Sequence, residues 1–230
     1  MNVRLGAVVL LLAGCAGGGQ PSSDFSLTGA RETAALAAEA DIAVHVDLIR
    51  GMLAQDNNYA ALAHIQDQQR RSGNTPLLRY LEAEARRRLG ETAAAEALYR
   101  GLLRGEMAAQ AYHGLGLLYA TRDLTQAIGF LREASQRRAT DAELRSDLGF
   151  ALLRAGRYRE SMTELATAVE LDAASSKARN NLLLLLITTG DEAGVKRVAA
   201  DTGVDAKTLT RLRKQAQSLR VRKTDAGGMR

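Results

Sequence analysis

The chain has 230 residues, 46% of them hydrophobic and 4% aromatic, with a formal net charge of +5. The apolar share is enough for a folded core, while few aromatic residues and only 2 Pro favour helices over a β-sandwich or barrel. One cysteine excludes an intrachain disulfide, and three scattered histidines without metal-ligand spacing indicate no metal site and no cofactor.

The start of the chain predicts a lipoprotein signal. Arg4 precedes nine apolar residues at 5–13, a run that is too short to span a bilayer but has the length of a signal-peptide core. The run ends in Leu-Ala-Gly-Cys at 12–15, which resembles a bacterial lipobox. The resemblance implies that residues 1–14 are removed and that Cys15 is lipidated. A plain secretory signal with a chance cysteine and an uncleaved N-terminal anchor are the alternatives.

Residues 15–30 are expected to form the lipidated cysteine and a flexible tether, because residues 16–24 are rich in Gly and Ser and contain one Pro. In the Gram-negative sorting pattern an Asp directly after the cysteine retains a lipoprotein at the inner membrane. Ala16 stands there instead. The pattern therefore implies a lipid anchor at the periplasmic face of the outer membrane.

A 33-residue period runs through residues 31–203. The unit Tyr112-x2-Leu115-Gly116-x2-Tyr119, continued as Ala127-x3-Leu131-x2-Ala134, resembles the tetratricopeptide (TPR) signature with one residue missing from its turn. Five units align on one position of their first helices, at a nearly constant spacing. These positions are Arg50, Ala83, Gly116, Gly149 and Leu183.

Each unit predicts two helices, because apolar residues recur at i, i+3, i+4 and i+7. Thr75, Asp141 and either Ser175 or Ser176 are expected to cap first helices. Three glycines are expected to end first helices in a left-handed conformation: Gly90, Gly156 and Gly190. The sequence thus predicts an all-α TPR superhelix of about 4–5 helix pairs, with a helix at residues 31–44 covering the first pair.

The C-terminal segment predicts a capping helix over residues 204–221 and a basic disordered tail over 222–230. Asp205 can cap this helix, which carries an apolar stripe of Leu209, Leu212, Ala216 and Leu219. Residues 207–230 hold eight Lys and Arg against Asp225 alone. An anionic lipid or an acidic protein surface could use this patch, and the solvated face of a capping helix is the alternative. The repeats are mildly acidic without it, so no nucleic acid is expected as a partner.

No catalytic residues are predicted, and the chain is not expected to be an enzyme. The sequence has no Ser-His-Asp order, nucleophile elbow, metal-ligand motif or phosphate loop. Gly114-x-Gly116 is half of a dinucleotide fingerprint, but it lies inside a predicted helix with no strand before it.

The inner wall of a TPR array is formed by residues beside the packing positions of each first helix. In the last three units several of these are Leu, Ile or Phe, which favours an apolar groove for an amphipathic helix or an extended segment. Alternatively, the C-terminal helix folds over Leu184 and Ile187 and leaves only Leu117, Phe150 and Leu153 in the groove. For His113, an ordinary surface histidine is the alternative. The predicted partner-binding residues are Tyr80, Arg87, His113, Leu117, Phe150, Leu153, Arg154, Asn180, Leu184 and Ile187.

The region from Leu144 to Gly190, with LRSDLGFALLRAGRYRESMTELATAVELD and KARNNLLLLL, is similar to the TadD family of the tight-adherence (Flp) pilus. The lipobox, the chain length and the basic C-terminal extension add to the resemblance. It implies a pilotin-like role in type IVc (Tad/Flp) pilus biogenesis. The groove would bind a secretin subunit, often near its C-terminus, and support its outer-membrane targeting or assembly.

Two other functions remain open at this level. One is a scaffold subunit of an envelope machine, resembling the TPR lipoprotein of the β-barrel assembly machine. The other is an adaptor for a periplasmic protease or a peptidoglycan enzyme.

Overall fold

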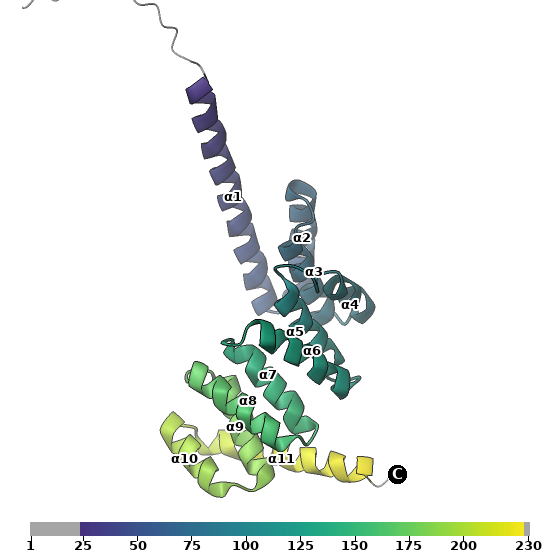
Figure 1. Cartoon of the computed structure of the whole chain (residues 1–230), viewed down its shortest axis with the longest axis vertical. Helices are drawn as coiled ribbons and strands as arrows, with labels where there is room; N and C mark the ends of the chain where they lie inside the picture. The colour runs from purple at the N-terminus through teal and green to yellow at the C-terminus, as the bar shows by residue number, and fades with distance from the viewer. Residues whose placement is uncertain (1–23, 228–230) are drawn as a thin grey trace, which may run out of the picture. The chain divides into compact units, whose positions relative to one another are not determined.

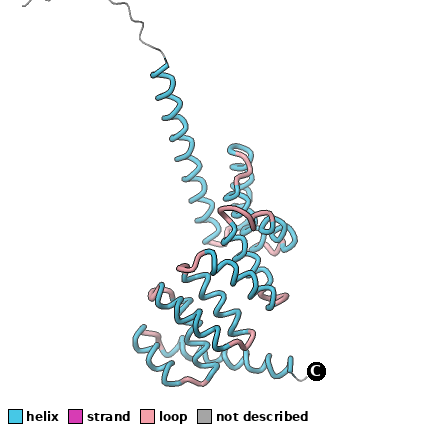
Figure 2. Tube along the Cα trace, in the orientation of Figure 1, coloured by secondary structure: helices cyan, strands magenta, loops and turns pink. Residues whose placement is uncertain are grey.

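A computed structural model describes residues 24–227, which contain eleven α-helices and no strand (Figures 1 and 2). The chain divides into two compact units, residues 1–43 and 44–230. The helices are α1 (Asp24–Ala54), α2 (Asn58–Ser72), α3 (Pro76–Arg88), α4 (Thr92–Arg100), α5 (Ala108–Tyr119), α6 (Leu124–Arg137), α7 (Ala142–Arg154), α8 (Tyr158–Leu171), α9 (Ser176–Thr189), α10 (Glu192–Thr202) and α11 (Ala206–Gly227).

Within residues 44–230, helices α3 to α10 form four consecutive pairs, and each first helix packs on its own second helix. The first helix of one pair also contacts the second helix of the pair before it, so the apolar faces form a continuous core. The TPR superhelix predicted from the 33-residue period is confirmed.

The predicted helix boundaries are confirmed in detail. The side chains of Thr75, Asp141 and Ser175 each accept a hydrogen bond from a backbone N–H of the first turn that they precede. The three predicted end glycines all have positive φ, between 74° and 82°. These residues therefore set where the first helices start and stop.

Gly149 allows the close approach of α7 and α8. A Cβ at this position would lie 2.6 Å from Cγ of Leu165, a side chain that is completely buried. Gly116 makes the same approach one repeat earlier, where a Cβ would lie 2.5 Å from Cγ of Leu131. At Gly116 and Gly149, the aligned position is therefore a glycine because the second helix packs too close for a side chain.

The N-terminal region differs from expectation. A tether up to residue 30 and a separate helix at 31–44 were expected, but α1 is one continuous helix from Asp24 to Ala54. Residues 31–43 are mostly Ala, Leu and Glu without Gly or Pro, so nothing interrupts the helix. Cys15 and the rest of residues 1–23, which include the predicted signal peptide, lie outside the described residues.

The C-terminal helix α11 packs on α9. Asp205 caps it as predicted, since its Oδ1 accepts a hydrogen bond of 2.6 Å from the backbone N–H of Thr208. Leu212 and Ala216 are 3% and 1% exposed, which confirms the apolar stripe. The helix continues to Gly227, so the tail predicted for 222–230 is wrong for residues 222–227. No Gly or Pro occurs between Ala206 and Ala226 to end it earlier.

Candidate functional site

An open hollow of about 290 Å³ lies where three first helices, α5, α7 and α9, stand side by side. Most of its floor is apolar and comes from α5 and α7, with one side chain from α6. Polar side chains from α7 and α9 stand among these. The lining residues are Leu117, Ala120, Leu131, Asp147, Phe150, Ala151, Arg154, Lys177 and Asn181.

Repeat geometry brings these residues together. Leu117 and Phe150 are one repeat apart and hold the same position in successive units. Lys177 and Asn181 are one turn apart on α9 and lie one repeat after Glu143 and Asp147. Equivalent positions of adjacent first helices therefore meet in one hollow.

A buried carboxylate connects the three first helices beside the hollow. Asp147 of α7 is 8% exposed. Its Oδ2 lies 2.8 Å from Nε2 of His113 on α5, and its Oδ1 lies 2.7 Å from Nζ of Lys177 on α9. Lys177 also donates a hydrogen bond of 3.3 Å to the exposed Glu143. His113 is thus paired within the fold and is not a free surface residue.

These contacts set the charge of the pair. Burial raises the pKa of Asp147, but the hydrogen bond with His113 and the charge of Lys177 outweigh it and hold the pKa below its usual value. For Lys177, burial lowers the pKa, while the Asp147 carboxylate raises it by more, so the pKa lies above its usual value. The pair is therefore ionised at neutral pH.

Arg154 lines the hollow and connects α7 to the end of α5. Its Nη1 donates a hydrogen bond of 2.7 Å to the backbone carbonyl of Ala120, at the end of α5. A cation there also complements the negative end of the helix dipole. Arg88, two repeats earlier, makes the same contact with the carbonyl of Leu53. Partner contact by Arg154 stays a prediction, and the structure shows that this side chain joins two repeats.

Three predicted groove residues belong to the core. Leu153, Leu184 and Ile187 are 3%, 1% and 7% exposed and share one apolar cluster with Leu212 and Ala216 of α11. The expectation that they line an open groove is wrong, because α11 packs its apolar stripe on α9. The structure has the alternative arrangement, in which the C-terminal helix covers Leu184 and Ile187, but it differs from that alternative in burying Leu153 as well.

Two others, Tyr80 and Arg87, lie on α3 away from the hollow. Arg87 donates a hydrogen bond of 2.9 Å to Glu84, which also accepts one from the buried hydroxyl of Tyr99. Tyr80 packs near the Tyr99 ring, at 6.4 Å between centroids, and lines a separate hollow of about 240 Å³ next to the end of α1. The structure thus does not bring these two residues to the site formed by α5, α7 and α9.

The sequence missed three polar residues of the hollow: Asp147, Lys177 and Asn181. Asn180 was predicted, but its neighbour Asn181 lines the hollow, with its Nδ2 donating a 3.0 Å hydrogen bond to Oγ of Ser146. One signal could have found them. Oppositely charged or hydrogen-bonding residues recur one repeat apart, as at 113/147 and 143/177.

Among residues 24–227, no group of three or more His, Cys, Asp and Glu side chains could hold a metal ion. No helix in that part of the chain is both long and apolar enough to cross a bilayer. The hollow offers apolar contact and hydrogen-bond donors.

Comparison with known proteins agrees with this architecture. Residues 118–184 match the tetratricopeptide repeat family model. The chain is 33% identical over 220 residues to the TPR repeat-containing protein PA4299 of Pseudomonas aeruginosa. The alignment covers 94% of this chain and 84% of that protein.

Solved structures share the fold. TTC0263, a thermophilic TPR protein of Thermus thermophilus, superposes with a TM-score of 0.62 at 20% identity over 78% of this chain and 99% of that one. Pseudomonas aeruginosa PilF superposes with a TM-score of 0.61 at 14% identity, over 84% of this chain and 94% of that one. YrrB, a TPR protein with an unusual peptide-binding site, superposes with a TM-score of 0.54 at 16% identity, over 74% of this chain and 90% of that one.

The stacked helix pairs define an α-helical repeat protein. With the sequence relative described above, they show that the chain belongs to the tetratricopeptide-repeat family. Proteins of this family are generally non-enzymatic scaffolds that bind protein partners. Protein–protein interaction is accordingly the function class of this chain.

Proposed function

We propose that the chain is a non-enzymatic, pilotin-like lipoprotein that binds a secretin subunit in type IVc (Tad/Flp) pilus biogenesis. In this proposal the acyl chains on Cys15 anchor the protein at the periplasmic face of the outer membrane. The hollow binds a C-terminal segment of the secretin and supports its targeting and assembly. The lipobox and the similarity to the TadD family support the anchor and the pathway.

The hollow carries the binding part of the proposal. Leu117, Phe150 and Ala151 offer an apolar floor, which favours an apolar side chain of the bound segment. Arg154, Lys177 and Asn181 are hydrogen-bond donors at its edges, and they suit the carbonyl oxygens of a peptide backbone. The fold neighbour YrrB, with its peptide-binding site, is a precedent for a bound peptide on this fold.

The test follows the secretin in cells. In a strain with Cys15→Ala, we expect the protein to leave the outer-membrane fraction and the secretin to fail to assemble there into heat-stable rings. Phe150→Arg should leave the protein in the outer membrane but give the same secretin defect, because a charged side chain fills the hollow. Leu171→Arg is the control, since Leu171 is 41% exposed on α8 and does not line the hollow. Normal ring assembly in both Cys15→Ala and Phe150→Arg would refute the proposal.

A further inference from the structure

Helix α11 has two opposite faces. At 100° per residue, Leu209, Leu212 and Ala216 fall on one side, and this side packs on α9. Lys207, Arg211 and Lys214, at i, i+4 and i+7, fall on the other side and are exposed. Packing therefore turns a row of cations outward.

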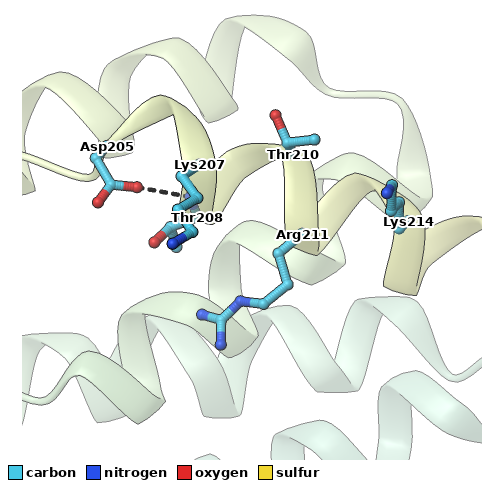
Figure 3. A pocket seen from close by; sticks show the side chains of 6 residues that line it. All are labelled: Asp205, Lys207, Thr208, Thr210, Arg211 and Lys214. Atoms are coloured by element: carbon cyan, nitrogen blue, oxygen red, sulfur yellow. Dashed lines mark hydrogen bonds between the residues drawn. The ribbon is translucent and has the colours of Figure 1, made fainter.

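The basic row borders an open hollow of about 800 Å³ (Figure 3). The described residues that line it are Asp205, Lys207, Thr208, Thr210, Arg211 and Lys214. Figure 3 shows the Arg211 guanidinium extending well away from the α11 ribbon, and a dashed line marks the hydrogen bond that the backbone N–H of Thr208 donates to Asp205. The carboxylate of Asp205 thus serves as the helix cap. Its pKa is lowered mainly by the hydrogen bonds with Thr208 and to a smaller extent by the charge of Arg211.

The cations of this row lack ion pairs in the described part of the chain. Most arginines of α3 to α8 are paired, as in Arg145 with Glu164 at 2.8 Å. On α11, Arg213 pairs with Glu192 at 2.9 Å, but it points away from the row. Among the described residues, no carboxylate oxygen lies within the ion-pair distance of 4.0 Å from a side-chain nitrogen of Lys207, Arg211 or Lys214.

The row belongs to a basic end of the chain. Residues 192–230 contain ten Lys and Arg against four Asp and Glu, whereas residues 24–191 have slightly more acidic than basic residues. Lys196 and Arg197 of α10 are exposed as well. The excess positive charge therefore gathers at α10 and α11, and its complement is an extended anionic surface.

We infer that the outer face of α11, defined by Lys207, Arg211 and Lys214, docks on the anionic phospholipid headgroups of a membrane. Three long cations spread over two helical turns, about 10 Å, suit a flat array of phosphates better than one small ligand. A bilayer is favoured over an acidic protein because the lipid anchor at Cys15 would hold the chain beside one. This last point rests on the proposed function.

The test is vesicle co-sedimentation of the full chain with Cys15→Ser, so that no acyl chain contributes. Anionic vesicles of phosphatidylcholine with phosphatidylglycerol are compared with neutral vesicles of phosphatidylcholine alone. Binding through the apolar run at residues 5–13 does not need anionic lipid, so the neutral vesicles measure it separately. We expect binding to the anionic vesicles that weakens with salt. The double variant Arg211→Gln/Lys214→Gln should reduce the affinity for anionic vesicles about thirtyfold. Each cation near an anionic surface contributes about 1 kcal/mol, and about 1.4 kcal/mol corresponds to a factor of ten in affinity.

The matched control is Arg104→Gln/Arg159→Gln, which removes the same charge from two exposed arginines on other parts of the repeats. It should change binding by no more than about threefold. Equal losses in the two double variants, or no preference for anionic vesicles, would overturn the inference. So would polyglutamate or inorganic phosphate displacing the protein from vesicles at low concentration, because the face would then suit an acidic protein or a free anion. Neither the anchor nor a secretin enters this assay, so its failure leaves the proposed function untouched.

Discussion

Nε2 of His113 on α5 lies 2.8 Å from Oδ2 of Asp147 on α7, across two successive repeats. Because Lys177 of α9 binds the same carboxylate, one buried side chain connects three first helices. The same three helices form the hollow. We conclude that this network fixes the spacing of the walls to which a partner segment would bind.

Replacing Asp147 should destabilise the repeats. Asp147→Asn keeps the shape but removes the charge that His113 and Lys177 bind, and we expect the free energy of unfolding in urea to fall by about 1–3 kcal/mol. The control is Glu143→Gln, whose carboxylate is 65% exposed and contacts the same lysine. It should cost less than about 0.5 kcal/mol. Equal effects of the two substitutions would show that burial of the carboxylate does not matter.

The stabilisation by Asp147 should depend on pH. Its pKa is lowered in the folded protein, so folding favours the ionised carboxylate, and the contribution is complete above the usual aspartate pKa of about 3.9. It is lost as the pH falls through the lower folded pKa. The difference in unfolding free energy between the wild type and Asp147→Asn should therefore shrink below about pH 4. A difference that grows on acidification would contradict the assignment.

The close approach at Gly149 gives a packing prediction. In Gly149→Ala the new Cβ would lie 2.6 Å from Cγ of Leu165, so α7 and α8 must separate, and we expect a loss of about 1–3 kcal/mol. Gly129→Ala is the control on the exposed side of α6, where nothing lies within 4 Å of a new Cβ. It should stabilise the protein by up to about 1 kcal/mol through helix propensity. Thermal unfolding of the two variants should thus move in opposite directions.

The hydroxyl of Tyr99 is expected to matter for stability. It donates a hydrogen bond to Glu84, a residue that is only 9% exposed. The Tyr99 ring packs against Gly114, where a Cβ would collide with it. Tyr99→Phe leaves one carboxylate oxygen of Glu84 without its donor, so we expect a loss of about 1–3 kcal/mol in urea unfolding. Tyr59→Phe, at a residue that is 78% exposed, should change stability by less than about 0.5 kcal/mol. Similar losses would show that Glu84 finds another donor.

The repeat architecture could be predicted from sequence because its causes are local. Gly149 is required by a helix contact inside its own unit, and Thr75 and Asp141 cap the helices that directly follow them. A fixed period repeats these signals, so each unit supports the assignment of the next. The prediction of a tether is wrong for residues 24–30. The Gly- and Ser-rich composition of residues 16–23 favours a tether that continues to residue 30, whereas α1 begins at Asp24.

The hollow could be predicted only in part because it depends on packing between units. Leu117 and Phe150 were found from the repeat pattern. Leu184 was assigned to the same wall, but α11 covers it, and no local signal shows where a terminal helix will pack. Asp147 was missed because its partners lie on two other repeats.

Binding of a peptide to the hollow tests the central claim most directly. Isothermal titration calorimetry would use a peptide with the C-terminal residues of the secretin from the same cell. Leu117→Arg places a charge on the apolar floor, and Leu171→Arg is the matched control on α8. We expect the wild type and Leu171→Arg to bind equally and Leu117→Arg to bind at least about tenfold more weakly. Unchanged affinity of a folded Leu117→Arg, or no binding by the wild type, would contradict the account.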